Sequence, residues 1–150
     1  MRQRGFTLIE LIAVLVIMVT LAVVAMGSFN PNDYQLSAAR DELVGALRYA
    51  QEMSLSHTGA NDYQVTLTAG GYSVTQAGVP IPHPLTGAGS YDSNWSNVVL
   101  DSTGTIGFDG YGEPWLGGGL AWGGNQLSVT LSVGNASGIV RVERVTGFVR

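Results

Sequence analysis

The sequence predicts an α+β protein in which a long N-terminal helix packs on an antiparallel β-sheet head. Three observations support this class: an apolar segment near the N-terminus, an amphipathic segment after it, and strand-like alternation in the remainder. Apolar residues make up 45% of the 150 residues and charged residues only 12%, about half the charged share of an ordinary soluble domain. The apolar excess is concentrated in residues 11–26, where only Thr20 interrupts it. We therefore expect a hydrophobic rod followed by a β-rich head.

The apolar segment extends from Phe6 to Met26. As a helix it would be about 31 Å long at 1.5 Å per residue, which is enough to cross a bilayer. Three interpretations compete for it: a cleaved secretory signal, a plain membrane anchor, or the retained helix that follows a short leader. A cleaved signal normally has a shorter apolar core of about 7–15 residues. Glu10 argues against a plain anchor, because an acid inside a membrane helix costs about 2.5–3.5 kcal/mol on insertion scales.

A cut between Gly5 and Phe6 would provide Glu10 with a partner. The new terminal amine of Phe6 would be a cation about one helical turn from Glu10, or it could pair with Glu10 of a neighbouring subunit. Arg2 and Arg4 precede the apolar segment, and positive residues beside a span stay in the cytoplasm. We expect a single-pass membrane protein whose N-terminus is cytoplasmic and whose head lies on the opposite side of the membrane.

The segment Arg-Gly-Phe-Thr-Leu-Ile-Glu-Leu at residues 4–11 resembles the leader motif of the type IV pilin superfamily. This resemblance implies that a prepilin peptidase cleaves after Gly5 and N-methylates Phe6, and that Glu10 is needed for assembly. It also implies as partners other pilin or pseudopilin subunits, an inner-membrane assembly platform and membrane lipid, and a final location in a pilus or pseudopilus. The domains that follow from it are a prepilin leader (1–5), a transmembrane and filament-core helix (6–29), an amphipathic helix on the head (30–57) and a periplasmic β-rich head (58–150).

The amphipathic helix is predicted to begin at Pro31, with Asn30 as its N-cap. Its apolar residues recur every three or four positions and should pack on a sheet; they are Leu36, Ala39, Leu43, Ala46, Leu47, Ala50 and Met53. Arg48 and Glu52 are spaced for an ion pair on another face, and Glu42 is also expected on a polar face.

The head is predicted to contain three hairpins, because apolar residues alternate there with period two and turn residues interrupt them. Their ranges are 63–74 with a turn at Gly70-Gly71, 98–108 with a turn at 102–104, and 127–145 with a turn at 135–138. Two long loops, 77–96 and 109–125, separate them. Loops of this length are uncommon and are often functional.

Residues 37–52, 107–114 and 146–150 are similar to segments of minor pilins of the H/FimT type. The whole pattern also resembles the minor C subunit of the mannose-sensitive haemagglutinin pilus. These resemblances imply a minor type IV pilin or a type II secretion pseudopilin with a structural, assembly role.

We expect no enzymatic activity, no cofactor and no metal site. His57 and His83 lie in unrelated contexts, cysteine is absent, and no Gly-x-Ser-x-Gly motif occurs. Asp109 and Glu113 have the chemistry of a calcium loop, but their spacing favours a glycine turn.

A tip-located binding module is the alternative function, either an adhesin or a DNA-uptake minor pilin. Trp95, Trp115 and Trp122 in the two long loops could stack on sugar rings. Competence-type relatives bind DNA through a C-terminal Gly-Arg-x-Arg element, where this chain has Phe148 in place of the first Arg. The net charge of -4 also opposes phosphate contacts, so nucleic acid is not an expected partner.

Overall fold

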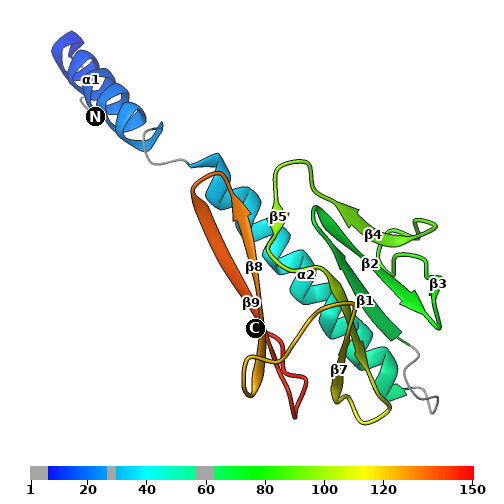
Figure 1. Cartoon of the computed structure of the whole chain (residues 1–150). Coiled ribbons are helices and arrows are strands. Elements are labelled where there is room, and N and C mark those ends of the chain that lie inside the picture. The colour runs from blue at the N-terminus through cyan, green and yellow to red at the C-terminus, as the bar shows by residue number, and fades with distance from the viewer. Residues whose placement is uncertain (1–6, 27–29, 57–62) are drawn as a thin grey trace. The chain divides into compact units, whose positions relative to one another are not determined.

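The computed structural model describes residues 7–26, 30–56 and 63–150, and Figure 1 shows its elements. The chain divides into two compact units, Met1–Pro31 and Asn32–Arg150. Gly5, Phe6 and His57 lie outside the described residues, so what the sequence predicts about them remains a prediction. Within the described residues, no helix combines the length and apolar character that crossing a membrane requires.

Helix α1, Leu8–Met26, belongs to the first unit. It begins just after Thr7, whose carbonyl oxygen accepts hydrogen bonds from the backbone N–H groups of Glu10 (3.1 Å) and Leu11 (3.2 Å). Within this chain its large apolar side chains are exposed on all sides, from Leu8 to Val24. The hydroxyl of Thr20, the polar interruption, donates to the carbonyl of Ile17 at 2.9 Å, which satisfies it within the helix.

Helix α2, Pro31–Ser56, begins at the predicted proline. Proline suits a first helical position because its missing N–H would have had no partner there. Six members of the predicted apolar stripe are buried, Met53 is half-buried, and Ser54 is buried beside them. The helical period of the stripe is therefore confirmed.

The larger sheet contains six antiparallel strands. Its order is β3 (Val79–Pro80), β2 (Gly71–Gln76), β1 (Tyr63–Thr68), β6 (Gly104–Phe108) and β7 (Pro114–Gly117), while β4 (Tyr91–Asn94) pairs with the same edge of β2 as β3 does.

The first predicted hairpin is confirmed as β1–β2, but its turn is Ala69-Gly70 and not Gly70-Gly71. Gly71 already pairs with Thr68 on one side and Asn94 on the other. A Cβ at Gly71 would overlap the carbonyl of Ser93, so the glycine is needed for the close approach of β4.

The smaller sheet has the order β5 (Val99–Leu100), β8 (Gln126–Val133) and β9 (Ala136–Glu143). The third predicted hairpin is confirmed as β8–β9, although the predicted turn at 135–138 is wrong. Ala136, Ser137 and Gly138 are already paired with β8, and the chain reverses at Gly134, whose φ of +58° is a left-handed conformation.

The second predicted hairpin, 98–108, is wrong. Leu100 pairs with Leu131 in the smaller sheet, whereas Ile106 pairs with Val65 in the larger one. The chain changes sheets between them, and Asp101 fixes this change by two hydrogen bonds to Thr130. The carboxylate of Asp101 accepts the backbone N–H of Thr130 at 2.9 Å, and the backbone N–H of Asp101 donates to the Thr130 carbonyl at 3.0 Å. These bonds attach the segment to β8 and leave β6 free to pair with β1.

The two long loops are also shorter than predicted, since β3 and β4 lie within 77–96 and β7 lies within 109–125. His83 organises the turn between β3 and β4: its Nδ1 accepts the N–H groups of Leu85 (3.2 Å) and Thr86 (3.4 Å). Its ring also contacts Tyr91, with centroids 4.4 Å apart.

Helix α2 runs along both sheets (Figure 1), and its buried stripe joins side chains of both into one core cluster. Leu43, Leu47 and Phe108 are among the largest fully buried side chains of this cluster. The predicted α+β class, with a helix packed on antiparallel sheet, is confirmed.

Candidate functional site

The N-terminal site is centred on Glu10 in the first turn of α1. Its backbone N–H is held by Thr7, through the carbonyl oxygen at 3.1 Å and the hydroxyl at 3.4 Å, and its side chain is exposed. An exposed carboxylate among exposed apolar residues is available to a charge from outside the helix. The predicted partner, the Phe6 amine, lies outside the described residues.

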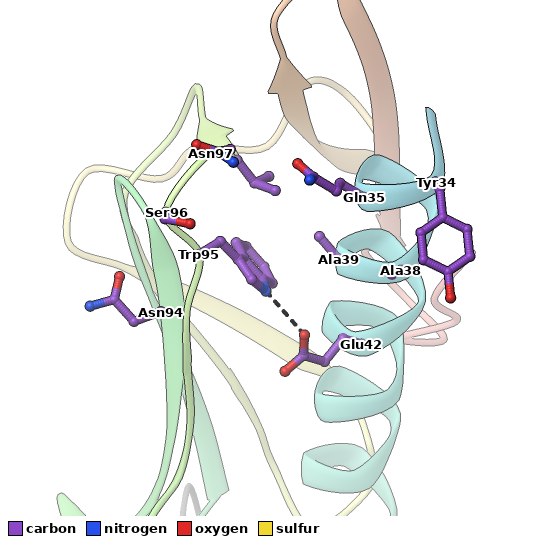
Figure 2. Close-up of a pocket in the computed structure, with 10 residues that line it drawn as sticks. Tyr34, Gln35, Ala38, Ala39, Glu42, Asn94, Trp95, Ser96 and Asn97 are labelled. Atoms are coloured by element: carbon purple, nitrogen blue, oxygen red, sulfur yellow. Dashed lines mark hydrogen bonds between the residues drawn. The ribbon is translucent and has the colours of Figure 1, made fainter. Parts of the chain in front are cut away.

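A second site is an open groove of about 320 Å³ on the head, between the N-terminal half of α2 and the chain that follows β4 (Figure 2). It is lined by Tyr34, Gln35, Ala38, Ala39, Glu42, Asn94, Trp95, Ser96, Asn97 and Val98. The two alanines on α2 leave the space that larger side chains would fill. Most of the lining surface is apolar.

Glu42 organises the wall of this groove. Its Oε2 accepts the indole N–H of Trp95 at 3.0 Å, and its Oε1 accepts the hydroxyl of Tyr72 at 3.2 Å. The rings of Tyr72 and Trp95 are 5.7 Å apart, and Tyr91 packs edge-on against Tyr72 at 6.1 Å. Burial and the nearby Glu42 carboxylate raise the pKa of Tyr72 well above its ordinary value, so Tyr72 remains a neutral donor.

The sequence predicts only that Glu42 lies on a polar face of the helix, and it does not predict that Glu42 joins Tyr72 to Trp95 by hydrogen bonds. It is exposed, but both its oxygens are engaged. No local pattern could have revealed this, because Trp95 lies 53 residues further along the chain.

The three predicted tryptophans occupy different settings. Trp95 lines the groove. Trp115 lies across Gly107 on the neighbouring strand, where a Cβ would overlap its indole, and its Nε1 is buried without a hydrogen bond in the described part of the chain. Trp122 is half-buried against the core. Of the three, Trp95 is the one that lines the groove described above.

Asp109 forms a turn, as the glycine-turn interpretation predicted. Its Oδ1 accepts the backbone N–H groups of Tyr111 (2.9 Å) and Glu113 (2.8 Å), an arrangement typical of an Asx turn. Across residues 7–26, 30–56 and 63–150, no group of three or more metal-ligating side chains occurs.

Several arginines have structural partners. Arg48 donates from Nη2 to the carbonyl of Val149 at 2.9 Å, in place of the expected pair with Glu52. Arg40 donates from Nε to the carbonyl of Ile139 at 3.2 Å. Arg150 forms an ion pair with Glu143 at 3.4 Å. These hydrogen bonds and this ion pair connect helix α2 and the last residues of the chain to β9 and to each other.

Residues 1–26 match the family model described as a prokaryotic N-terminal methylation motif. The beginning of the chain is therefore a type IV pilin-like leader followed by its helix, and the α+β head is consistent with a pilin-like fold. Such a motif implies processing by a prepilin peptidase and assembly with other pilin-type subunits. No curated protein and no solved structure matches the chain.

Proposed function

We propose that this chain is a minor type IV pilin or type II secretion pseudopilin, which is processed by prepilin peptidase and assembled through its N-terminal helix. The observation that carries the proposal is the match of residues 1–26 to the N-terminal methylation motif. The fold agrees with this role, since α1 exposes apolar side chains all round and the head has its own core. A helix of that kind needs apolar surroundings, which lipid provides before assembly and neighbouring subunits provide afterwards.

Processing is tested by producing the chain with and without a prepilin peptidase and measuring the intact mass of the product. We expect a product that begins at N-methylated Phe6. Gly5→Ala should block the cut because it changes the residue directly before the scissile bond, whereas Gln3→Ala, which changes a leader residue away from that bond, should be cut normally. A product that begins elsewhere, or normal cleavage of Gly5→Ala, would overturn the leader assignment.

Assembly is tested at Glu10, which we propose pairs with the Phe6 amine of a neighbouring subunit. An unpaired buried charge costs about 3–5 kcal/mol, so Glu10→Gln and Glu10→Ala should each lower incorporation into sheared filaments at least tenfold. Thr20→Ala on the same helix is the matched control and should assemble normally. Membrane levels and cleavage are measured in parallel, and normal incorporation of cleaved Glu10→Gln would refute the pairing.

For the location, we propose a single pass through the inner membrane with the head in the periplasm. The support comes from the sequence: the apolar stretch from Phe6 to Met26 begins ahead of α1 as the structure describes it, and Arg2 and Arg4 precede it. Proteinase K added to intact spheroplasts should digest the head. Protection of the head in spheroplasts, with digestion after lysis, would contradict this topology.

The minor, H/FimT-like status rests on the resemblance of residues 37–52, 107–114 and 146–150. It predicts that the chain is a small fraction of the subunits in sheared filaments when measured by quantitative mass spectrometry. A chain that makes up most of the filament mass would be a major pilin instead. A DNA-uptake role has less support, because Phe148 replaces an arginine and Arg150 pairs with Glu143.

A further inference from the structure

The groove beside Trp95 has the size of a small-ligand site. Its volume of about 320 Å³ is at the lower end of the range of roughly 300–1,000 Å³ that is usual for ligand pockets. Ala38 and Ala39 form the helix side, and the buried Val98 contributes an apolar surface opposite. The groove is open to solvent, so a ligand could enter without movement of the backbone.

The aromatic wall of the groove is fixed in advance. The indole of Trp95 is held by the hydrogen bond from Nε1 to Glu42 (3.0 Å), and Glu42 is held in turn by Tyr72 (3.2 Å). A side chain with a fixed rotamer loses little entropy when it binds a ligand. A rigid indole face favours a partner that has one flat apolar face.

Polar side chains stand at the mouth of the same groove. Figure 2 shows the amides of Gln35, from α2, and Asn97, from the opposite segment, at one end of the groove near Trp95, with Ser96 below Asn97. All three residues are exposed, and their side chains make no hydrogen bond within the described residues. An amide offers both donors and an acceptor, so the pair can match hydroxyl groups, which also donate and accept.

The charge of the lining selects against ions. No Lys, Arg or His lines the groove, and the single charged lining residue is Glu42. Its carboxylate would repel an anion. Both of its oxygens already accept hydrogen bonds, which leaves it a weak site for a cation. An uncharged ligand therefore fits best.

We propose that this groove binds a neutral sugar residue of a glycan, with the C–H face of the ring on Trp95 and the hydroxyls facing Gln35 and Asn97. Pyranose rings combine a flat apolar face with a rim of hydroxyls, which is the combination that this lining matches. This binding function goes beyond a structural role in a filament and does not depend on the N-terminal leader. Either proposal can therefore fail without the other.

Binding is measured on the full chain in micelles of an amine-oxide detergent, because maltoside detergents carry sugar head groups. The probes are glucose, galactose, N-acetylglucosamine and N-acetylgalactosamine, with sialic acid as the anionic comparison. Saturation-transfer NMR reports contact with the sugar, and the indole ¹⁵N–H signal of Trp95, assigned by its loss in Trp95→Phe, reports the location. We expect at least one neutral sugar to bind with a Kd of about 1 mM and to shift that signal, and sialic acid to bind at least tenfold more weakly.

The variants separate this groove from the rest of the surface. Asn97→Ala and Gln35→Ala change exposed side chains and should not disturb folding, yet each should weaken binding about threefold to tenfold. Trp95→Ala should weaken it about tenfold or more. Asn125→Ala removes an exposed amide outside the groove and should leave the Kd unchanged.

Three results would overturn the proposal. The first is the absence of binding by every neutral sugar at about ten times the expected Kd. The second is binding that Asn97→Ala and Gln35→Ala leave unchanged, which would place the sugar elsewhere. The third is a loss of filament incorporation in these variants with no sugar binding, which would make the groove a subunit contact.

Discussion

Gly107 and Trp115 provide a sharp test of how the larger sheet is packed. They face one another across β6 and β7, and the indole of Trp115 covers the space where a Gly107 side chain would be. A Cβ added at Gly107 would lie more than an ångström inside the ordinary carbon contact distance of about 3.5 Å. Because the approach involves the rigid indole ring, either the ring or the strand must move. We expect Gly107→Ala to destabilise the head by about 1–3 kcal/mol, which is the usual cost of overpacking.

The effect should depend on the tryptophan. In a Trp115→Ala background the space is empty, and Ala is favoured over Gly in a strand interior by roughly 0.5–1 kcal/mol. Gly107→Ala should therefore be neutral or stabilising there. The double-mutant cycle then gives a coupling of about 1–4 kcal/mol, most of which lies within the range known for residues in contact.

The assay is urea unfolding of the full chain in detergent micelles, followed by circular dichroism so that loss of a tryptophan does not alter the signal. Gly45→Ala is the control for replacing a glycine, because nothing lies within 4 Å of its added Cβ. It should stabilise α2 by about 1 kcal/mol. If Gly107→Ala lowers the free energy of unfolding by the same amount with and without Trp115, then the indole of Trp115 does not limit the space at Gly107.

Three further predictions concern a core side chain of the head and two side chains that form hydrogen bonds between its segments. Leu43→Ala removes a fully buried side chain and should cost about 2–5 kcal/mol in the same unfolding assay; a loss below about 1 kcal/mol would mean that the core is not packed as described. Arg48→Gln removes the hydrogen bond to the Val149 carbonyl, so hydrogen exchange at the amides of residues 148–150 should accelerate, at a stability cost of about 1 kcal/mol; unchanged exchange would show that the bond is unimportant. Burial alone would raise the pKa of Asp101, but hydrogen bonds from Thr130 and Ser102 outweigh it and lower the pKa below 3.8. The ionised carboxylate of Asp101 therefore stabilises the fold at pH values above 3.8, and this stabilisation is lost as the pH falls through the lowered pKa of the folded state. The difference in the free energy of unfolding between wild type and Asp101→Asn should be constant from neutral pH to about pH 5 and should shrink below it. A difference that grows on acidification would refute the sign.

Local periodicity accounts for what the sequence predicted well. The stripe of α2 repeats every three or four residues and the β1–β2 and β8–β9 hairpins alternate every two, so each pattern lies within one element or between adjacent strands. The predicted turns of these two hairpins lie one or two residues too late in the chain, because Gly71 and Gly138 belong to strands and not to turns. The backbone of Ser93 lies close to Gly71, and the side chain of Leu36 lies close to Gly138.

Contacts between distant segments could not be predicted from the same patterns. Val98 to Leu100 alternates as any strand does, and it is assigned to the smaller sheet by its pairing with β8 and by the bonds of Asp101 to Thr130. In the same way, Glu42 and Trp95 each fit an ordinary local interpretation, and the groove between them exists only after the sheet has folded against α2. The leader, by contrast, is a linear motif, so the sequence alone was sufficient to find it.

The turn between β3 and β4 offers a position at which the head can be labelled. Leu85 and Gly89 are exposed there, and nothing lies within 4 Å of a Cβ added at Gly89. The chain contains no cysteine, so Gly89→Cys would introduce a unique thiol at a position where the fold does not oppose a side chain. A maleimide dye attached at that thiol would report, by fluorescence microscopy, whether the subunit enters a filament as proposed.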